Sequence, residues 1–385
     1  MLGPLGNVHV EHMAVAVQQQ GYDVVVGGET WTDAWDAKLA EHGIPVHVRT
    51  WPTARWMRRL IAETRPDVVH AHWIPIAEQA LVYGANPLVA TAWGSDVLLA
   101  NRRQKATYRL LLRHVDVVTA DSAALARALG HLGAPPERIM VHGWGVDLER
   151  FSPGSQSRGD AKRELGLPSG PVVLSARWLR DLYNPRVILR AFERLAGERD
   201  DITLVLKHLD RKPPDLGPMR YPDRVRVIGL VPYEQMVSYY RAADVCISIP
   251  NSDSSPRSVW EAMGCGTPCV LSDLPWVHEL IRDGEHALVV PISEEAVADA
   301  MRRLLADQDL ADHLARQGRQ LVEEHHDADK ELRRLCDVYQ RLARRGATDR
   351  ALRASIGTVA ATAATAVARV RRAAARGAMV PNGEH

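Results

Sequence analysis

Residues 250–275, PNSDSSPRSVWEAMGCGTPCVLSDLP, contain two carboxylates, Asp253 and Glu261, with seven residues between them. The run ADVCISI before Asp253 predicts a strand, and a helix that begins near Pro256 would carry Glu261. A loop of small residues that leads into a helix presents free N–H groups and a positive dipole end to an anion such as a diphosphate. A carboxylate one turn into that helix can accept hydrogen bonds from ribose hydroxyls. The spacing thus indicates phosphate and sugar recognition; the alternative is a turn residue followed by a solvated helix residue.

The residues around this pair resemble the donor-site signature of retaining glycosyltransferases of the GT-B fold, glycosyltransferase family 4 type (glycosyl transferases group 1). The family pattern is Glu-x7-Glu ending in LEAMAxGxPVV, and VWEAMGCGTPCV aligns Glu261 with the second Glu. Asp253 stands where the first residue is usually Glu, which keeps the charge and shortens its reach. The resemblance implies a catalytic role for both carboxylates and donor binding by Ser254, Ser255 and Pro256.

The resemblance runs from about residue 3 to residue 345 and implies an α/β fold of the GT-B type, with two Rossmann-like domains whose parallel sheets face each other across a cleft. Apolar runs that alternate with helical patterns independently favour βα units and parallel sheets. The strand candidates are 22–28, 45–49, 67–73, 87–93, 115–120, 138–143, 171–177, 202–207, 224–230, 244–249, 268–273 and 287–291.

Four segments follow from this pattern. Residues 1–153 would form the N-terminal, acceptor-side domain, and residues 154–327 the donor domain, joined through the polar stretch SPGSQSRGD. By resemblance, helix 328–345 would cross back onto the first domain, and residues 346–385 form an Ala/Arg-rich tail. The segment MLGPLGN supplies a loop and at most the end of the expected first strand, so either that strand is very short or the true start lies upstream.

Positive charge is expected beside the donor diphosphate. Arg177 ends a predicted strand, where ligands of parallel sheets bind, and a guanidinium can hold a diphosphate with two hydrogen bonds. The family has Lys-Gly a few residues later, whereas Tyr183 and Asn184 stand there in this sequence. Lys207, which ends the next predicted strand, or Arg180 would then supply the second cation.

Further site residues follow from the resemblance. Gly6 in the first loop and Glu279 in PWVHELIRDG are implied to bind the donor, with a helix-surface position as the alternative for Glu279. His9, His72 and Asp96 are predicted on the acceptor side, because they follow the first loop or end strands of the first domain.

The composition of the chain argues against several classes of function. The chain has 385 residues and a net charge of +1, with no basic stripe that would indicate nucleic acid as a partner. Four cysteines are too few for a disulfide scaffold and favour a reducing cytoplasm. Cys265 and Cys269 lack the second pair of ligands that a zinc site needs, and no Asp-x-Asp pair is placed to hold a metal. We expect no cofactor and a metal-independent site.

The tail stretch 351–376 combines a weakly apolar core with clustered arginines. It predicts either a solvated tail or a basic helix on the inner, anionic face of the membrane.

The resemblance implies a glycosyltransferase that moves a sugar from a nucleoside-diphosphate sugar to a polysaccharide, glycolipid or small metabolite with retention of configuration. The alternatives are a non-catalytic nucleotide-sugar-binding subunit and a sugar-nucleotide epimerase of the GT-B type. The departure at Asp253 and the missing Lys would fit the first alternative.

Overall fold

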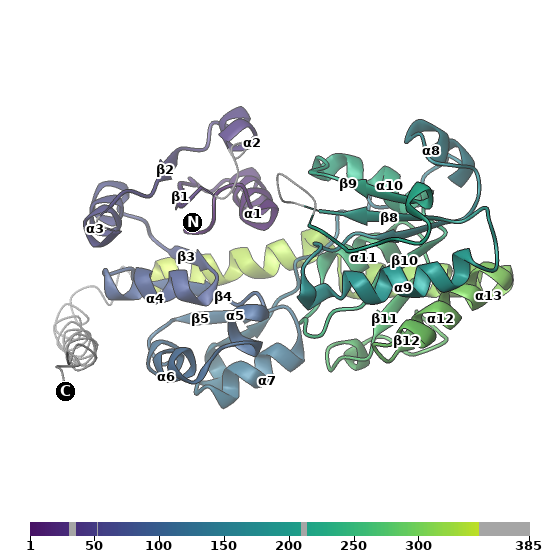
Figure 1. Ribbon diagram of the computed structural model, residues 1–385. Helices are drawn as coiled ribbons and strands as arrows, with labels where there is room; N and C mark the ends of the chain where they lie inside the picture. Colours follow the sequence, from purple (N-terminus) through teal and green to yellow (C-terminus); the bar gives the residue numbers. More distant parts are fainter. Residues whose placement is uncertain (31–35, 52, 209–213, 346–385) are drawn as a thin grey trace, which may run out of the picture.

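The computed structural model describes residues 1–30, 36–51, 53–208 and 214–345. Two α/β domains lie side by side, the first coloured purple to blue and the second teal to green (Figure 1). The tail 346–385, for which membrane contact is predicted, lies outside the described residues. None of the helices in the described part of the chain combines the length and apolarity that a membrane span requires.

The strands described in the first domain all pair in parallel. Strands β3 to β6 are hydrogen-bonded in sequence order, and β1 pairs with β2. Their bounds are β1 Val26–Gly28, β2 Val46–Val48, β3 Val69–His72, β4 Leu88–Thr91, β5 Val117–Ala120 and β6 Ile139–Val141.

Residues 1–5 lie between these two groups of strands. Leu2 forms parallel bridges to Gly27 of β1 and to Ala71 of β3, and its N–H donates to the carbonyl oxygen of His70 at 2.8 Å. The segment therefore fills the position of the expected first strand over a short length, and it closes the edges that β1 and β3 would otherwise expose.

The second domain contains a six-stranded parallel sheet in the order β12-β11-β10-β7-β8-β9. This is the doubly wound arrangement, in which the chain starts in the middle of the sheet and reverses direction, so that ligands bind at the carboxyl ends near the reversal point. The bounds are β7 Val172–Ser175, β8 Thr203–Lys207, β9 Val225–Ile228, β10 Val245–Ser248, β11 Cys269–Ser272 and β12 Leu288–Val290.

Helices cover both sheets. In the first domain they are α1 Val8–Gln19, α2 Asp36–Glu41, α3 Thr53–Thr64, α4 Ile74–Val82, α5 Ser95–Leu98, α6 Arg102–Leu111 and α7 Ala123–His131. In the second domain they are α8 Arg158–Glu164, α9 Pro185–Ala196, α10 Met236–Ala242, α11 Arg257–Gly264, α12 Glu294–Ala306 and α13 Gln308–His325.

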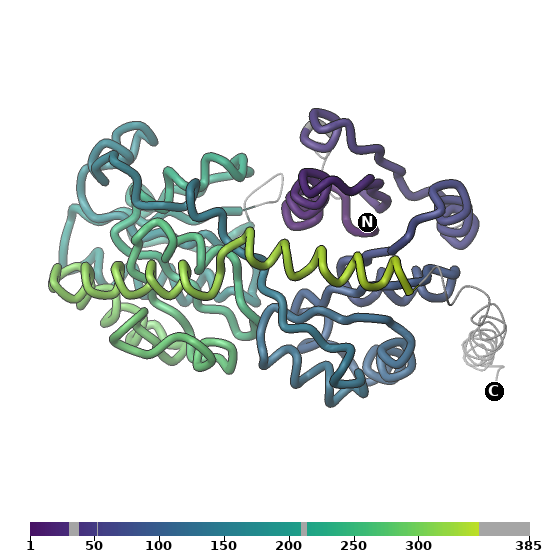
Figure 2. The backbone as a smooth tube through the Cα atoms, turned by 180° about the vertical axis from the view of Figure 1, so that it is seen from behind, coloured from purple at the N-terminus to yellow at the C-terminus, as the bar shows by residue number. Residues whose placement is uncertain are grey.

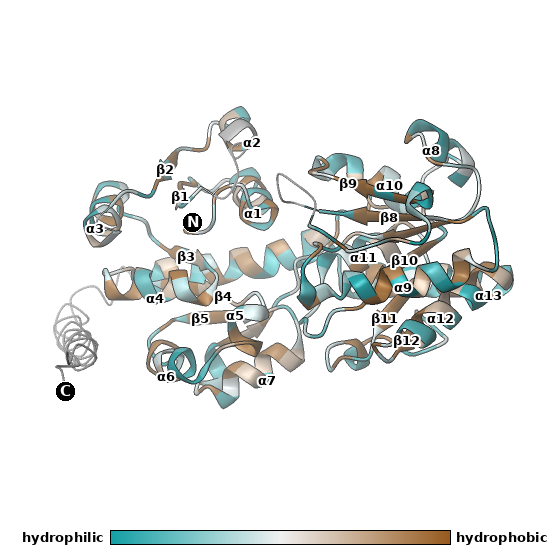
Figure 3. Ribbon diagram, viewed as in Figure 1, coloured by the Kyte–Doolittle hydropathy of each residue, from teal (hydrophilic) through white to brown (hydrophobic). Residues whose placement is uncertain are grey.

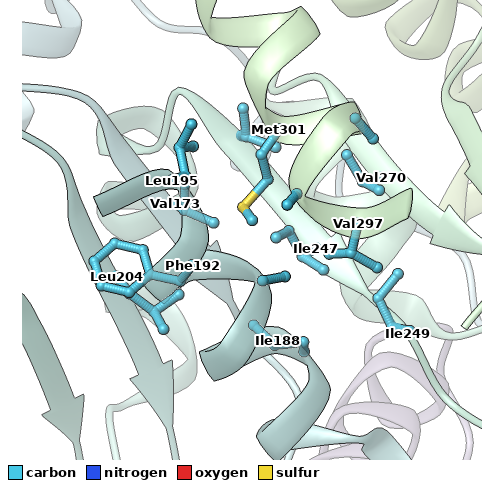
Figure 4. Close-up of a cluster of buried hydrophobic side chains, with 14 of the residues drawn as sticks. Val173, Ile188, Phe192, Leu195, Leu204, Ile247, Ile249, Val270, Val297 and Met301 are labelled. Atoms are coloured by element: carbon cyan, nitrogen blue, oxygen red, sulfur yellow. The ribbon is translucent and has the colours of Figure 1, made fainter. Parts of the chain in front are cut away.

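The cores explain this layering. The strands of the second domain are coloured brown, whereas the covering helices α9 and α12 carry both brown and teal residues (Figure 3). One apolar face of each helix thus packs on the sheet. Phe192 of α9 and Met301 of α12 meet Ile247 of β10 in a cluster of buried side chains (Figure 4). This packing holds the strand ends that carry the candidate site.

Residues 328–345 form a final helix that lies across the first domain, as seen from behind (Figure 2). Its side chains Leu335 and Tyr339 belong to a buried cluster with Leu5 and Val26 of the first domain. The Tyr339 hydroxyl also lies 2.5 Å from Nδ1 of His70 in β3. The chain thus crosses between the domains twice, and the second crossing starts where Val146 bridges Asp327.

Candidate functional site

The loop between β10 and α11 brings Asp253, Ser254, Ser255 and Pro256 together; we call residues 253–256 the donor loop. Pro256 is the N-cap of α11 and gives it no side-chain capping hydrogen bond, so the helix start depends on its backbone N–H groups. Ser255 has a φ of 146°, which L-residues rarely adopt. Trp260 holds this conformation because its indole N–H donates to Ser255 Oγ at 2.8 Å.

Arg177, two residues beyond β7, contacts both this loop and α11 through two nitrogens of its guanidinium. Nη2 donates to Asp253 Oδ2 at 2.6 Å, and Nη1 donates to Ser258 Oγ at 3.1 Å. The guanidinium lies 4.5 Å from the centroid of the Tyr183 ring. The predicted catalytic residues Arg177 and Asp253 are therefore brought together, as an ion pair with both side chains mostly buried.

The departure from the family's Lys-Gly has a structural consequence. Asn184 adopts the left-handed conformation, with φ 51° and ψ 47°, directly before α9. This conformation favours glycine, and asparagine is among the few residues that tolerate it. Asn184 thus keeps the turn that glycine would make, while Tyr183 replaces the lysine with a ring that packs against Arg177.

Glu261 is 4% exposed and lies one turn into α11. Its Oε1 accepts a hydrogen bond from the Tyr233 hydroxyl at 2.7 Å, and Oε2 accepts one from the Tyr240 hydroxyl at 3.0 Å. Burial raises the pKa of both phenols, and the negative charge of Glu261 adds to this, so both remain donors at neutral pH.

Arg257, the first residue of α11, adds a cation to this cluster. Its Nε lies 3.0 Å from Glu261 Oε1, and its guanidinium packs over the ring of Tyr233. Nη2 also lies 3.4 Å from Nδ1 of His12 in α1, so this contact links the two domains.

The two candidates for the second cation have different surroundings. Lys207, at the end of β8, is half-buried, and its pKa is lowered. Burial is the main cause. The charge of Arg177 lowers the pKa as well, and the charge of Glu261 opposes the shift. Lys207 is therefore close to both predicted site residues. Arg180 is exposed, and its guanidinium stacks on the Trp178 ring at 3.4 Å. The geometry favours Lys207 over Arg180.

The first domain faces the donor loop with aromatic side chains. His9 of α1 lies 4.3 Å from Trp144 and 5.9 Å from Trp93, measured between ring centroids. His72, at the end of β3, lies 6.1 Å from Trp144. Burial lowers the pKa of His72 to about 3, and that of His9 falls well below its usual value, first through burial and then through Arg257. Both imidazoles are therefore neutral at pH 7.

The neighbouring polar residues of this domain have structural partners. His70 bonds to Tyr339 and to Thr91, whose Oγ1 lies 2.6 Å from its Nε2, so this histidine belongs to the core. Asp96 is buried, and its two oxygens accept backbone N–H groups of Trp93 at 3.0 Å and Ile74 at 2.8 Å. Its described contacts are those of a capping residue, and its acceptor-side role stays a prediction.

Two predicted donor-binding residues lie outside the donor loop. Glu279 accepts hydrogen bonds from the backbone N–H groups of Ala123 and Ala124 at the start of α7, so it touches the first domain. Gly6 lies in the loop before α1 with a φ of 83°. The contacts of Glu279 link the two domains, and its role in donor binding stays a prediction.

Several residues of this site escaped the sequence reasoning. They are Asp121, Trp144, Tyr233, Tyr240, Arg257 and Ser258. Trp144 carried a usable signal, because HGWGVDLERF resembles the family segment NGVDxxxF and has Trp in the place of Asn. Arg257 and Ser258 lie inside the recognised motif, whereas the tyrosines reach Glu261 from another element and gave no local signal. Among the described residues, no group of three or more His, Cys, Asp and Glu side chains is placed to hold a metal.

The fold and this site define a two-domain GT-B protein with a cluster of paired arginines and carboxylates on its second domain. Residues 6–150 match the family model "Glycosyltransferase Family 4", and residues 157–321 match the model "Glycosyl transferases group 1". The chain belongs to this glycosyltransferase family.

Relatives and solved structures agree with this assignment. A D-inositol 3-phosphate glycosyltransferase of Acidothermus cellulolyticus is 30% identical over 69% of this chain and 66% of its own length. A putative teichuronic acid biosynthesis glycosyltransferase, TuaC of Bacillus subtilis, is 26% identical over 71% of this chain and 70% of its own. This chain spans less than two thirds of the first curated relatives that it matches, for example 60% and 59% of those from Geodermatophilus obscurus and Nocardia farcinica.

Two solved structures share the fold. Sucrose-phosphate synthase of Thermosynechococcus elongatus has a TM-score of 0.75 at 19% identity, covering 89% of this chain and 95% of that chain. HepE of Anabaena in complex with UDP and glucose has a TM-score of 0.72 at 18% identity, covering 88% and 98%.

Proposed function

We propose that this protein transfers a sugar from a nucleoside-diphosphate sugar to an acceptor, with retention of configuration and without a metal ion. The observation that carries the proposal is that two arginines lie at the first turn of α11: Arg177 donates to Ser258 Oγ, and Arg257 opens the helix and pairs with Glu261. Asp253 and Glu261 balance part of this charge, so the cluster and the helix dipole together favour an anionic ligand.

These groups would act on the leaving diphosphate. Negative charge grows on the departing oxygens in the transition state, and fixed cations and N–H groups stabilise it without reorganisation. Arg177 must exchange its bond to Asp253 Oδ2 for a diphosphate oxygen, or share its donors between them. A guanidinium has five N–H donors, which makes sharing possible.

Glu261 would hold the ribose. Each carboxylate oxygen can accept two hydrogen bonds, and among the described residues Oε2 accepts one, from Tyr240. Oε2 therefore retains capacity for a ribose hydroxyl, while Tyr233 and Arg257 fix the side chain through Oε1.

The acceptor would approach from the side of His9 and His72. In the front-face mechanism that the family resemblance implies, the departing phosphate takes the acceptor proton, so no covalent enzyme residue is required. The neutral imidazoles of His9 and His72 would bind acceptor hydroxyls without competing for the diphosphate.

Relatives suggest substrates. HepE of Anabaena was solved with UDP and with UDP-glucose, which makes UDP the first nucleotide to test here. The named relatives act in inositol phosphate glycosylation or teichuronic acid biosynthesis, which supports a polysaccharide, glycolipid or small-metabolite acceptor.

We propose a cytoplasmic location, with the tail as a peripheral contact on the inner face of the membrane. Deletion of residues 346–385 should then move protein out of the membrane fraction.

One observation favours a second candidate, a nucleotide-sugar-binding subunit without activity. The ion pair between Arg177 and Asp253 is short, at 2.6 Å, and neutralises the main diphosphate cation. An epimerase of the GT-B type would act on the donor alone, and formation of the epimeric nucleotide sugar without an acceptor would identify it.

The test is the melting temperature with UDP, GDP, ADP and CMP, each with and without EDTA. A ligand that binds only the folded state raises its stability by mass action. We expect one diphosphate to stabilise the wild type in EDTA, and Glu261→Gln to lose most of that shift. Glu198→Gln, a surface carboxylate that pairs with Arg302, serves as the control and should keep the full shift. A lack of any shift would contradict the proposed donor site.

A further inference from the structure

Residues 121–124, where β5 passes into α7, contact the second domain at two points. Ser254 Oγ donates to Asp121 Oδ2 at 3.0 Å, across 133 residues of sequence. The backbone N–H of Ala123 donates to Glu279 Oε2 at 2.7 Å, and that of Ala124 donates to Oε1. We call these two contacts the interdomain clasp.

The first contact is fully enclosed. Asp121 is 9% exposed and Ser254 is 1% exposed. A Cβ atom on Gly94 would come within 2.3 Å of Ser254 Oγ, so the loop after β4 leaves room for this serine only because residue 94 is glycine. The pKa of Asp121 is raised to about 8, mainly by burial. The negative charges of Asp253 and Asp96 raise the pKa as well, whereas hydrogen bonds from Ser254 and Trp144 lower it.

The second contact completes a helix cap. Ser122 Oγ accepts the N–H of Leu125 at 3.1 Å, which leaves the first two N–H groups of α7 to be satisfied. Glu279, which belongs to the second domain, accepts hydrogen bonds from both of these N–H groups. Its negative charge is also favourable at the positive end of the α7 dipole. Arg127 of α7 lies 3.5 Å from the same carboxylate.

Both contacts act on the surroundings of the donor loop. Ser255 holds a strained φ of 146°, and such strain persists where neighbouring groups determine the backbone from several sides. Trp260 fixes Ser255 from within the second domain, and Asp121 fixes Ser254 from the first. Ser254 directly follows Asp253, the partner of Arg177.

We propose that Asp121 and Glu279 are positioning residues: the donor loop takes its reactive conformation only when the two domains meet at the clasp. The loop that would bind the diphosphate is thereby coupled to the domain that would bind the acceptor. The kinetic part of this inference rests on the proposed function, whereas the clasp itself does not.

The kinetic test compares Asp121→Ala, Ser254→Ala and the double variant. We measure kcat for hydrolysis or transfer with UDP-glucose, GDP-mannose or ADP-glucose, and Kd for the corresponding diphosphate by calorimetry. Each single variant should lower kcat about tenfold, as expected for one hydrogen bond made in the reacting arrangement, with Kd nearly unchanged. The double variant should be no slower than the singles, because both remove the same bond. Asp121→Asn keeps an oxygen for Ser254 and should restore most of kcat.

Asp116→Ala is the matched control. Asp116 precedes β5 at its opposite end and accepts the N–H of Leu88 at 2.9 Å, so its loss should lower the melting temperature and leave kcat unchanged. Losses in kcat that simply multiply in the double variant, or an unchanged kcat in Ser254→Ala, would overturn the coupling.

Amide exchange tests the clasp independently of activity. In Glu279→Gln the N–H groups of Ala123 and Ala124 should exchange about tenfold faster, because an amide offers one accepting oxygen and no charge. Glu285→Gln, which alters a surface pair with Arg282, should leave them unchanged. Unaltered protection at α7 in Glu279→Gln would overturn the clasp, even if the wild type binds nucleotide and the proposed function holds. Failure of the wild type to bind any diphosphate would instead contradict the proposed function.

Discussion

The two domains present different chemistry to each other. The second domain offers charge: Arg177 pairs with Asp253, Arg257 pairs with Glu261, and Lys207 ends β8. The first domain offers aromatic rings, with His9 and His72 neutral beside Trp93 and Trp144, and the buried carboxyl of Asp121.

This difference follows from what each side is proposed to bind. A diphosphate is recognised by charge, which a helix start and a few cations provide in one short stretch of chain. An uncharged acceptor is recognised by shape and hydrogen bonds, which come from the ends of several strands. Both sides carry departures from the family: the donor side at Asp253 and at Tyr183 and Asn184, and the acceptor side at Trp144.

The largest effect is expected at Arg177. Arg177→Ala should lower kcat/KM by about a thousandfold, since it removes the cation that holds both Asp253 and Ser258. Arg177→Lys should recover little of it, because an ammonium cannot make both bonds in the same plane. Steady-state kinetics with the stabilising donor measures this. A fully active Lys variant would show that charge alone suffices.

Substitution of Lys207 and substitution of Arg180 should have clearly different effects on kcat. Lys207→Ala should lower kcat by about tenfold to a hundredfold, because its charge lies near Glu261 and Arg177, whereas exposed Arg180→Ala should leave kcat within about twofold. The same kinetic assay decides between them. Intact turnover in both variants would disprove the idea that either residue replaces the family's lysine.

Asp121 should make stability depend on pH. Its pKa of about 8 in the folded state exceeds that of an unfolded Asp, so the folded state binds more protons between about pH 4 and pH 8. The wild type should therefore lose stability across this range as the pH rises. From pH 5 to pH 9, the free energy of unfolding of Asp121→Asn should rise by at least about 1 kcal/mol relative to that of the wild type, as measured by urea unfolding. If the difference in unfolding free energy between the two proteins did not change with pH, the raised pKa would be wrong.

Trp144 tests the acceptor side. Trp144→Asn restores the residue of the quoted family pattern and removes the ring beside His9. We expect KM for the acceptor to rise about tenfold while the Kd for the nucleoside diphosphate is unchanged, because the ring lies on the first domain. An equal loss in nucleotide affinity would remove the distinction between the two faces.

The smallest effect is expected at the crossing helix. Tyr339→Phe removes the hydroxyl beside His70 and should lower the free energy of unfolding by about 1 to 3 kcal/mol, because buried His70 loses a partner. Nucleotide affinity should not change, since the contact lies behind the sheet of the first domain. Tyr22→Phe, whose hydroxyl donates to the Cys336 carbonyl oxygen from a less buried position, should cost less.

The strands were well predicted, because most of them form a short apolar run that a parallel sheet buries on both faces, although β2 and β6 are partly exposed. The motif also placed Asp253 and Glu261 correctly on a loop and one turn into a helix. For Glu279 the sequence indicated a donor-site residue, which stays a prediction, and gave no sign that this side chain also accepts an N–H from α7 of the other domain. No local pattern encodes a contact across 156 residues of chain.

By itself, the sequence determined the two sheets, the donor loop and the helix that follows it, because these depend on local hydrophobic patterns and on residues within one motif. The tertiary structure alone decided which tyrosines hold Glu261 and that Asp121 meets Ser254. The physical reason is that these contacts join elements distant in the sequence. Their partners are selected by how the two domains pack, which no short segment specifies.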